Sequence, residues 1–117
     1  TLALPDLEAL AAIDDPAQQL ARTVAELCRI HEAQFGYAWL GAQQRGESPT
    51  RDAGMQENDG LIDALAAIVA PPGSARAPLI RSLLDYLTYR AMRLAGRLSP
   101  ADAARELTAT LRPLTLE

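Results

Sequence analysis

Residues 79–114 read LIRSLLDYLTYRAMRLAGRLSPADAARELTATLRPL, and their apolar positions recur every three or four residues. This spacing is typical of an amphipathic helix, whereas a half-buried strand alternates apolar and polar residues. Ser99-Pro100 divides the stretch, because serine caps helix starts and proline is favoured at the first helical position. The sequence therefore predicts a long helix over about 74–97 and a last helix from Ser99 to about Leu114, whose continuation Pro113 limits.

The long helix is predicted to carry an apolar face too broad for one neighbouring helix to cover. That face consists of Ile80, Leu83, Leu84, Leu87, Ala91, Leu94 and Leu98. The last helix adds Leu107, Leu111 and Leu114 beside small alanines. Two adjacent amphipathic helices with more leucine than a small monomer needs indicate a helical dimer seam.

The rest of the chain also gives helical signals, with no period-two strand pattern and no hairpin dipeptide. We expect a short helix over 5–12, a long one over 15–35 that opens on Asp15-Pro16, and a shorter stretch through 39–44. Residues 45–54 predict an exposed loop, and a helix from Asn58 or Asp59 ends before Pro71-Pro72-Gly73. The predicted fold class is all-α: an antiparallel bundle of five to six helices in one domain, 1–117.

Composition excludes several classes of protein. The chain has 117 residues, 49% hydrophobic and 22% charged, which fits one ordinary globular domain. Its net charge is −4, and all 11 basic residues are arginine, so it does not resemble a nucleic-acid binder. No apolar run is long enough for a membrane span, and no basic signal segment opens the chain, so we expect a cytoplasmic location. Cys28 alone cannot form an internal disulfide or a cysteine metal cluster.

His31 lies in the middle of the apolar face of the helix over 15–35. That face also carries Leu20, Val24, Leu27 and Phe35. A buried imidazole needs a hydrogen-bond partner, so His31 is either a satisfied core histidine or a polar anchor in a ligand pocket. Metal binding and catalysis are disfavoured, because no second ligand, nucleophile or glycine-rich loop stands at the required spacing. We expect that the chain is not an enzyme and that it has no catalytic residue, no metal and no cofactor.

The five aromatic residues fall into two groups, which are Phe35, Tyr37 and Trp39, and Tyr86 and Tyr89. Aromatic side chains wall a small-molecule cavity as readily as they fill a core, so both interpretations stay open. A flank of the long helix spaces arginines at helical intervals, at positions 90, 93 and 97. A solvated or salt-bridged rim is the simpler interpretation of this flank, and contact with an anionic ligand is the alternative.

The order of these elements resembles the C-terminal domain of the tetracycline-repressor (TetR) family of transcriptional regulators. Residues 79–114 resemble the last two helices of that domain, and DPAQQLARTVAELCRIHEAQFG, residues 15–36, resembles the long helix that opens its core. The resemblance implies a domain that binds a small hydrophobic effector. It also implies a homodimer whose last two helices pair as a four-helix bundle. DNA binding by such a repressor is implied only for an N-terminal helix-turn-helix domain, which these residues do not include.

The resemblance implies two sets of functional residues. The expected ligand-binding residues are Leu27, His31, Phe35, Trp39, Leu65, Tyr89 and Met92. The expected dimer-interface residues are Leu83, Leu87, Arg90, Ala91, Leu94, Leu107 and Leu111. An alternative is an all-helical protein interaction module, in which another protein covers the apolar surplus and no small molecule binds.

Overall fold

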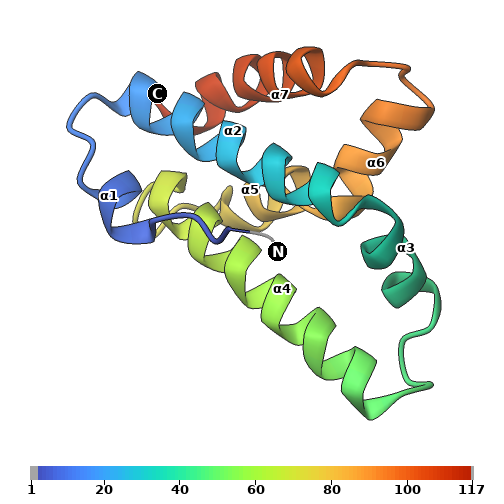
Figure 1. The fold of residues 1–117 in the computed structure, drawn as a ribbon. Helices are drawn as coiled ribbons and strands as arrows, with labels where there is room; N and C mark the ends of the chain where they lie inside the picture. Colours follow the sequence, from blue (N-terminus) through green and yellow to red (C-terminus); the bar gives the residue numbers. More distant parts are fainter. Residues whose placement is uncertain (1–2, 117) are drawn as a thin grey trace.

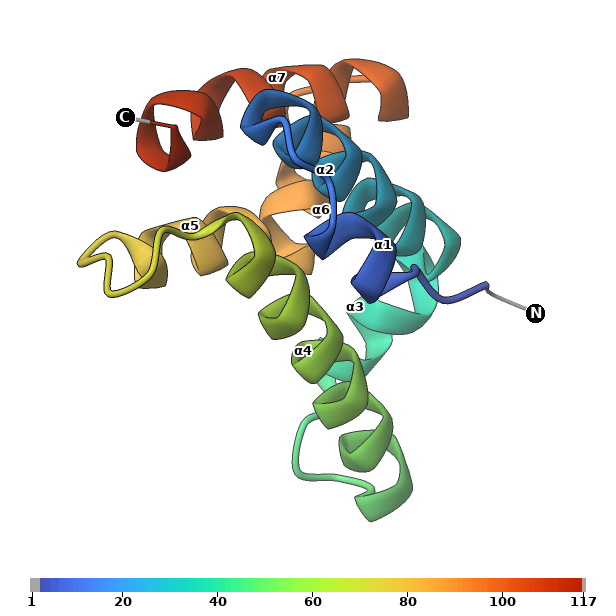
Figure 2. The same cartoon turned by 90° about the vertical axis from the view of Figure 1, so that its left-hand side faces the viewer.

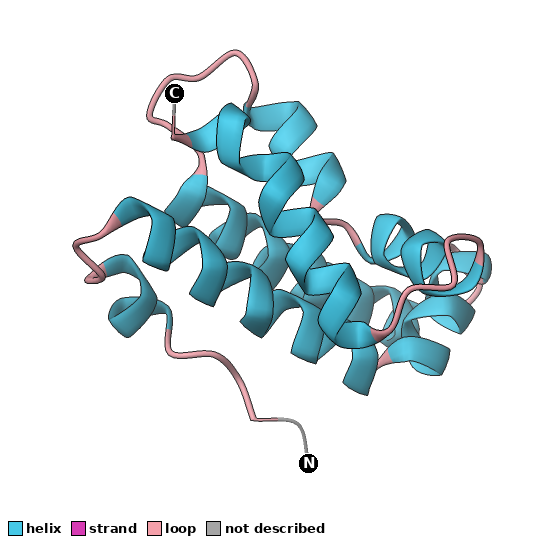
Figure 3. Ribbon diagram, turned by 90° about the horizontal axis from the view of Figure 1, so that it is seen from above, coloured by secondary structure: helices cyan, strands magenta, loops and turns pink. Residues whose placement is uncertain are grey.

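The computed structural model describes residues 3–116, except the side chain of Arg51, and every regular element in that range is a helix (Figures 1 and 3). The helices are α1 (Leu7–Ala11), α2 (Pro16–Ala33), α3 (Phe35–Gln43), α4 (Pro49–Val69), α5 (Ala77–Leu83), α6 (Tyr86–Leu94) and α7 (Pro100–Thr115). The all-α fold class is confirmed. No helix in this range is both long and apolar enough to cross a membrane.

Two of the predicted helix starts are confirmed in atomic detail. The Asp15 carboxylate accepts a hydrogen bond from the backbone N–H of Gln18 at 3.1 Å, and Pro16 opens α2. The Ser99 hydroxyl accepts from the N–H of Asp102 at 3.1 Å, and α7 begins at Pro100. Each cap satisfies an amide that the first helical turn leaves without a partner.

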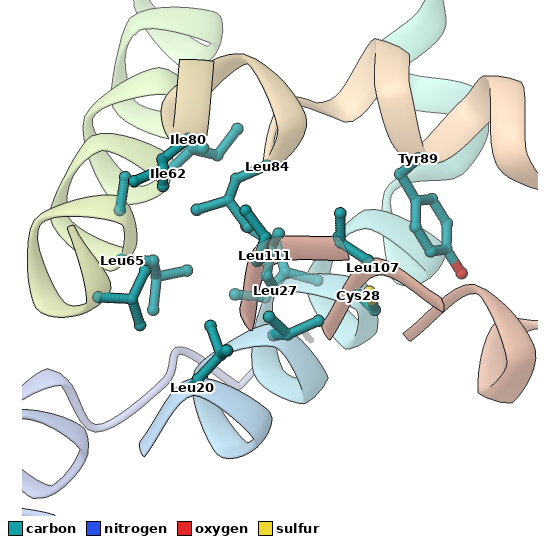
Figure 4. Packing of buried hydrophobic residues seen from close by; sticks show 14 of the residues in the cluster. Leu20, Leu27, Cys28, Ile62, Leu65, Ile80, Leu84, Tyr89, Leu107 and Leu111 are labelled. Atoms are coloured by element: carbon teal, nitrogen blue, oxygen red, sulfur yellow. The ribbon is translucent and has the colours of Figure 1, made fainter. Parts of the chain in front are cut away.

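Helix α2 is the centre of the molecule and packs along α7 on one side and against α4 on the other (Figures 1 and 2). Its buried face includes Leu20, Val24, Leu27 and Ile30, as the periodicity predicts. Figure 4 shows Leu27 among residues of three other helices: Leu65 of α4, Ile80 of α5 and Leu111 of α7. One continuous core therefore joins α2, α4, α5 and α7.

The predicted long helix over 74–97 is wrong, because the chain breaks between α5 and α6. Asp85 leaves helical geometry at φ −66° and ψ 154°, and its carboxylate accepts from the N–H of Leu87 at 3.1 Å. The hydroxyl of Thr88 also donates to the carbonyl of Ser82 at 2.7 Å across the break. Aspartate is a strong helix cap, and here that local preference interrupts a continuous apolar pattern.

The break changes which residues of the 74–97 segment face the core. Helix α5 buries Ile80, and Leu84 just after it is also buried. Helix α6 then buries Tyr86 and Tyr89. Leu87 and Leu94, which the continuous pattern places on the same face as Ile80 and Leu84, are exposed on α6.

The expected loop over 45–54 is shorter than predicted, because α4 begins at Pro49. The backbone N–H of Asp52 already donates to the carbonyl of Ser48 at 2.9 Å, and the Asp52 carboxylate accepts from the N–H of Gly46 at 3.0 Å. Ser48-Pro49 repeats the dipeptide that opens α7, although no apolar periodicity follows it at once.

Helix α3 and the first half of α4 extend away from the other helices as a hairpin (Figures 1 and 2). The two helices approach closely at Gly41, where an added Cβ would lie 2.5 Å from the sulfur of Met55. Met55 is buried there. Any larger residue at position 41 would therefore force the buried Met55 side chain to shift.

Helix α7 ends at Thr115, within one residue of its predicted end at about Leu114, and Pro113 lies inside its last turn. Proline removes one backbone donor in the last turn, where the loss of a single bond is tolerated.

Candidate functional site

Four rings from three helices form an aromatic cluster beside α2. His31 of α2 lies 5.7 Å from Tyr86 and 5.5 Å from Tyr89, measured between ring centroids. Phe35, the first residue of α3, lies 5.8 Å from Tyr86 and 6.3 Å from Tyr89. Three of these four contacts are edge-to-face, an arrangement that the charge distribution of aromatic rings favours. The structure thus brings together His31, Phe35 and Tyr89 of the expected ligand-binding set.

Each of the three polar side chains in the cluster has a partner within the chain. The Nε2 of His31 lies 2.8 Å from the carbonyl oxygen of Leu84, and because a carbonyl only accepts, this nitrogen carries the hydrogen. The Tyr86 hydroxyl donates to the carbonyl of Phe35, and the Tyr89 hydroxyl donates to Oε2 of Glu32 at 2.7 Å. His31 therefore has the geometry of a satisfied core histidine, and it holds the carbonyl at the break between α5 and α6.

Burial controls the ionisation of this region. It lowers the pKa of His31, against smaller opposing effects of the Leu84 carbonyl and Asp85, so the imidazole is neutral at pH 7. Burial, with a contribution from Glu32, raises the pKa of the Cys28 thiol to about 12. A thiol that stays protonated is a poor nucleophile, so Cys28 fits a packing role.

A bidentate ion pair ties α6 to α2 next to the cluster. Arg93 donates from Nε to Oε2 of Glu32 at 3.1 Å and from Nη2 to Oε1 at 2.9 Å. Its Nη1 also donates to the carbonyl of Leu98 at 2.9 Å. The hydrogen bond from Arg93 is the main cause of a lowered pKa for Glu32. The salt-bridged interpretation of the arginine flank therefore holds for Arg93.

Arg90, one turn earlier on α6, has different surroundings. Its guanidinium carbon lies 3.8 Å from the ring centroid of Trp39 on α3, which is a cation–π contact. Its Nε is buried and has no hydrogen-bond partner, and no carboxylate among the described residues pairs with it. The helical spacing pointed to this arginine, but the stacking partner lies 51 positions away and could not be found from local sequence.

The remaining expected ligand-binding residues are core residues or lie beside the core. Leu27 and Leu65 are fully buried in the hydrophobic cluster, and Met92 packs against that cluster. Trp39 is half-buried and contacts Arg90. None of the ring contacts of the aromatic cluster described above includes Trp39.

The expected interface residues divide into two groups. Leu107 and Leu111 of α7 are 3% and 0% exposed and belong to the chain's own core (Figure 4), so they cannot form the surface of a seam. Leu87 and Leu94 of α6 are 50% and 51% exposed, and Ala91 between them is exposed as well. Leu83 and Arg90 are half-buried.

The grooves on the surface lie elsewhere. An open groove of about 530 Å³ runs between α2 and α7, and its lining residues are Ala25, Cys28, Arg29, Glu32, Ala33, Pro100, Ala101 and Ala104. A second groove of about 450 Å³ shares Ala104 and continues toward Arg112. Neither is lined by any expected ligand-binding residue. Within residues 3–116, no three His, Cys, Asp or Glu side chains stand together as a metal site.

Comparison with known proteins adds no identification. No protein-family model matches the chain, and no curated protein or solved structure is significantly similar to it.

Proposed function

We propose that this chain is the dimerisation and effector-sensing domain of a TetR-like transcriptional regulator. The observation that carries the proposal is the outward apolar stripe of α6, formed by Leu87, Ala91 and Leu94. Leu87 and Leu94 are seven residues apart, so they lie on one face of the helix two turns from each other. Aligned half-exposed leucines are more typical of an interface than leucines scattered singly.

The stripe lies outside the hydrophobic core of the monomer. Helix α6 contributes Tyr89 to that core, together with the leucines of α7, and Tyr86 is buried as well. Covering the stripe with a second copy removes apolar surface from water without disturbing that core. The resemblance to the TetR family also implies that the penultimate helix, here α6, is one of the two helices that each copy contributes to the dimer bundle. The proposed seam differs in one respect, since it does not include Leu107 or Leu111, which are buried in the core.

The effector-sensing part of the proposal is supported by the aromatic cluster and by Trp39, which contacts Arg90 of α6. These side chains come from α2, α3 and α6, so a ligand among them contacts both the central helix and the helix of the proposed seam. A ligand that prefers one arrangement of these helices shifts the population toward it, by its difference in affinity for the two arrangements. In a complete regulator, a separate DNA-binding module reads out the shift.

A different protein on the α6 stripe is the second candidate, and one observation favours it. Arg90 and Arg97 flank the stripe, and neither makes an ion pair with a described residue. An acidic partner helix complements this face directly, whereas two copies must bring in acids from outside the stripe.

Equilibrium sedimentation tests the proposal. We expect the wild type to be a dimer, and Leu87→Glu to be a folded monomer, because a carboxylate buried within an apolar seam is not solvated. Leu79→Glu is the matched control, since Leu79 on α5 is 49% exposed outside the stripe, and it should remain dimeric. A monomeric wild type, or a Leu87→Glu protein that still dimerises, contradicts the proposal.

A further inference from the structure

The two grooves between α2 and α7 form one surface feature, which we call the α2–α7 groove. Their volumes are about 530 and 450 Å³, and both are lined by Ala104. Six of the lining residues are alanines, and all of these except Ala104 are exposed: Ala21, Ala25, Ala33, Ala101, Ala104 and Ala109. A surface of such short side chains leaves space for larger apolar side chains from a facing element.

The length of the α2–α7 groove suits a helix. Its lining residues on α7 run from Pro100 to Arg112, which is about 18 Å at the rise of an α-helix. Helices α2 and α7 lie side by side over this length (Figure 1). Two neighbouring helices take a third helix between them, and alanines allow it to approach closely. The occupant that fits is an amphipathic helix of about three turns, with anchors at helical spacing.

The charges along the α2–α7 groove are mainly positive, although the chain as a whole has a net charge of −4. Three arginines line it, namely Arg29, Arg105 and Arg112, and the only carboxylate among the lining residues is Glu32. Both oxygens of Glu32 are already bound by Arg93. The groove therefore complements an acidic occupant.

Two of these arginines stand on one rim of the groove. Arg105 and Arg112 are seven residues apart on α7, which places them about 10 Å apart along the helix axis. Arg112 makes no ion pair with a described residue. Arg105 pairs with Asp102 at 2.7 Å, but its side chain is 68% exposed, and an exposed pair of this kind contributes little and exchanges easily.

We propose that the α2–α7 groove is the docking site for an acidic amphipathic helix of another protein. The apolar side chains of that helix lie over the alanines. Two of its carboxylates, seven residues apart, lie against Arg105 and Arg112. A second copy of this chain is a poorer occupant, because a two-fold contact sets the arginines of one groove against those of the other. The groove shares no lining residue with the α6 stripe, so this inference does not rest on the proposed function.

A pair of synthetic peptides tests the docking site on the full chain. The acidic peptide has about 14 residues, leucines at helical spacing and glutamates beside them, and a hydrocarbon staple on its outer face holds it helical. The basic peptide has lysine in place of every glutamate. We expect the acidic peptide to bind the wild type at least about tenfold more tightly, as measured by fluorescence anisotropy of the labelled peptides, and added salt to reduce this difference.

Two variants and their matched controls locate the binding. The double variant Arg105→Gln, Arg112→Gln should bind the acidic peptide at least about fivefold more weakly, whereas Arg45→Gln, a 54% exposed arginine on the far hairpin, should stay within about twofold of the wild type. Ala25→Gln places a longer polar side chain in the groove and should also weaken binding. Ala53→Gln makes the same change at an exposed position of α4 and should not. Circular dichroism checks that each variant is folded.

Three results would overturn the inference. One is equal affinity for the acidic and basic peptides, and another is binding of neither. The third is a loss of self-association in Ala25→Gln that is absent in Ala53→Gln, because a second copy then occupies the groove. None of these results alters the expectation for Leu87→Glu on the α6 stripe, so a failure here is distinct from a failure of the proposed function.

Discussion

Leu87 and Leu94 of α6 behave differently from Leu107 and Leu111 of α7, although all four follow the same helical spacing in one stretch of sequence. The α7 pair is buried in the core, and the α6 pair is half-exposed. The difference arises at Asp85, which starts α6 as a new helix with its own orientation. Periodicity shows that a helix has an apolar face, but the breaks between helices decide whether that face meets the core.

The largest expected effect comes from removing a buried leucine. Leu111→Ala should destabilise the protein by about 3 kcal/mol, because it removes buried methyl groups and leaves a cavity between α2 and α7. Leu94→Ala, the same change on the exposed stripe, should cost less than about 1 kcal/mol at low protein concentration. Urea unfolding measures both. Equal losses would remove the distinction between the two leucine pairs.

The next test concerns the buried face of α6, which carries Tyr86 and Tyr89 and no leucine of the stripe. Tyr89→Phe keeps the ring but removes the hydrogen bond to Glu32, and it should cost about 1.5 kcal/mol. Tyr37→Phe is the control, because Tyr37 is 55% exposed on α3 and should change stability very little. If Tyr89→Phe is as neutral as Tyr37→Phe in urea unfolding, the tyrosine face does not hold α6 in its orientation.

The smallest effect is a pH dependence at the break itself. The folded state lowers the pKa of His31 below its ordinary value of 6.5, so the unfolded chain takes up the proton more readily. The contribution of neutral His31 to the free energy of unfolding is therefore fully present above about pH 6.5. It decreases as the pH drops, by at most about 1.4 kcal/mol per pH unit.

His31→Gln keeps a donor for the Leu84 carbonyl but cannot titrate. The free energy of unfolding, measured between pH 7 and 5, should decrease in the wild type as the pH drops. It should change less in this variant. Identical pH profiles would show that protonation of His31 is not coupled to folding.

Local signals in the sequence predicted the helix starts at Asp15-Pro16 and Ser99-Pro100, because caps act within one turn. They also predicted that His31 needs a hydrogen-bond partner. The Arg93–Glu32 pair and the Arg90–Trp39 stack join residues more than 50 positions apart, so only the packed fold reveals them. The break at Asp85 could not be predicted from the apolar period, because that period runs through it without interruption.

The central claim is that a second copy of the chain covers the α6 stripe. Its most direct test is the thermal unfolding midpoint, measured for the wild type and Leu87→Glu over a thousandfold range of protein concentration. Coupling of folding to dimerisation predicts a midpoint that rises with concentration for the wild type and stays constant for the variant. A wild-type midpoint that does not depend on concentration would contradict the account.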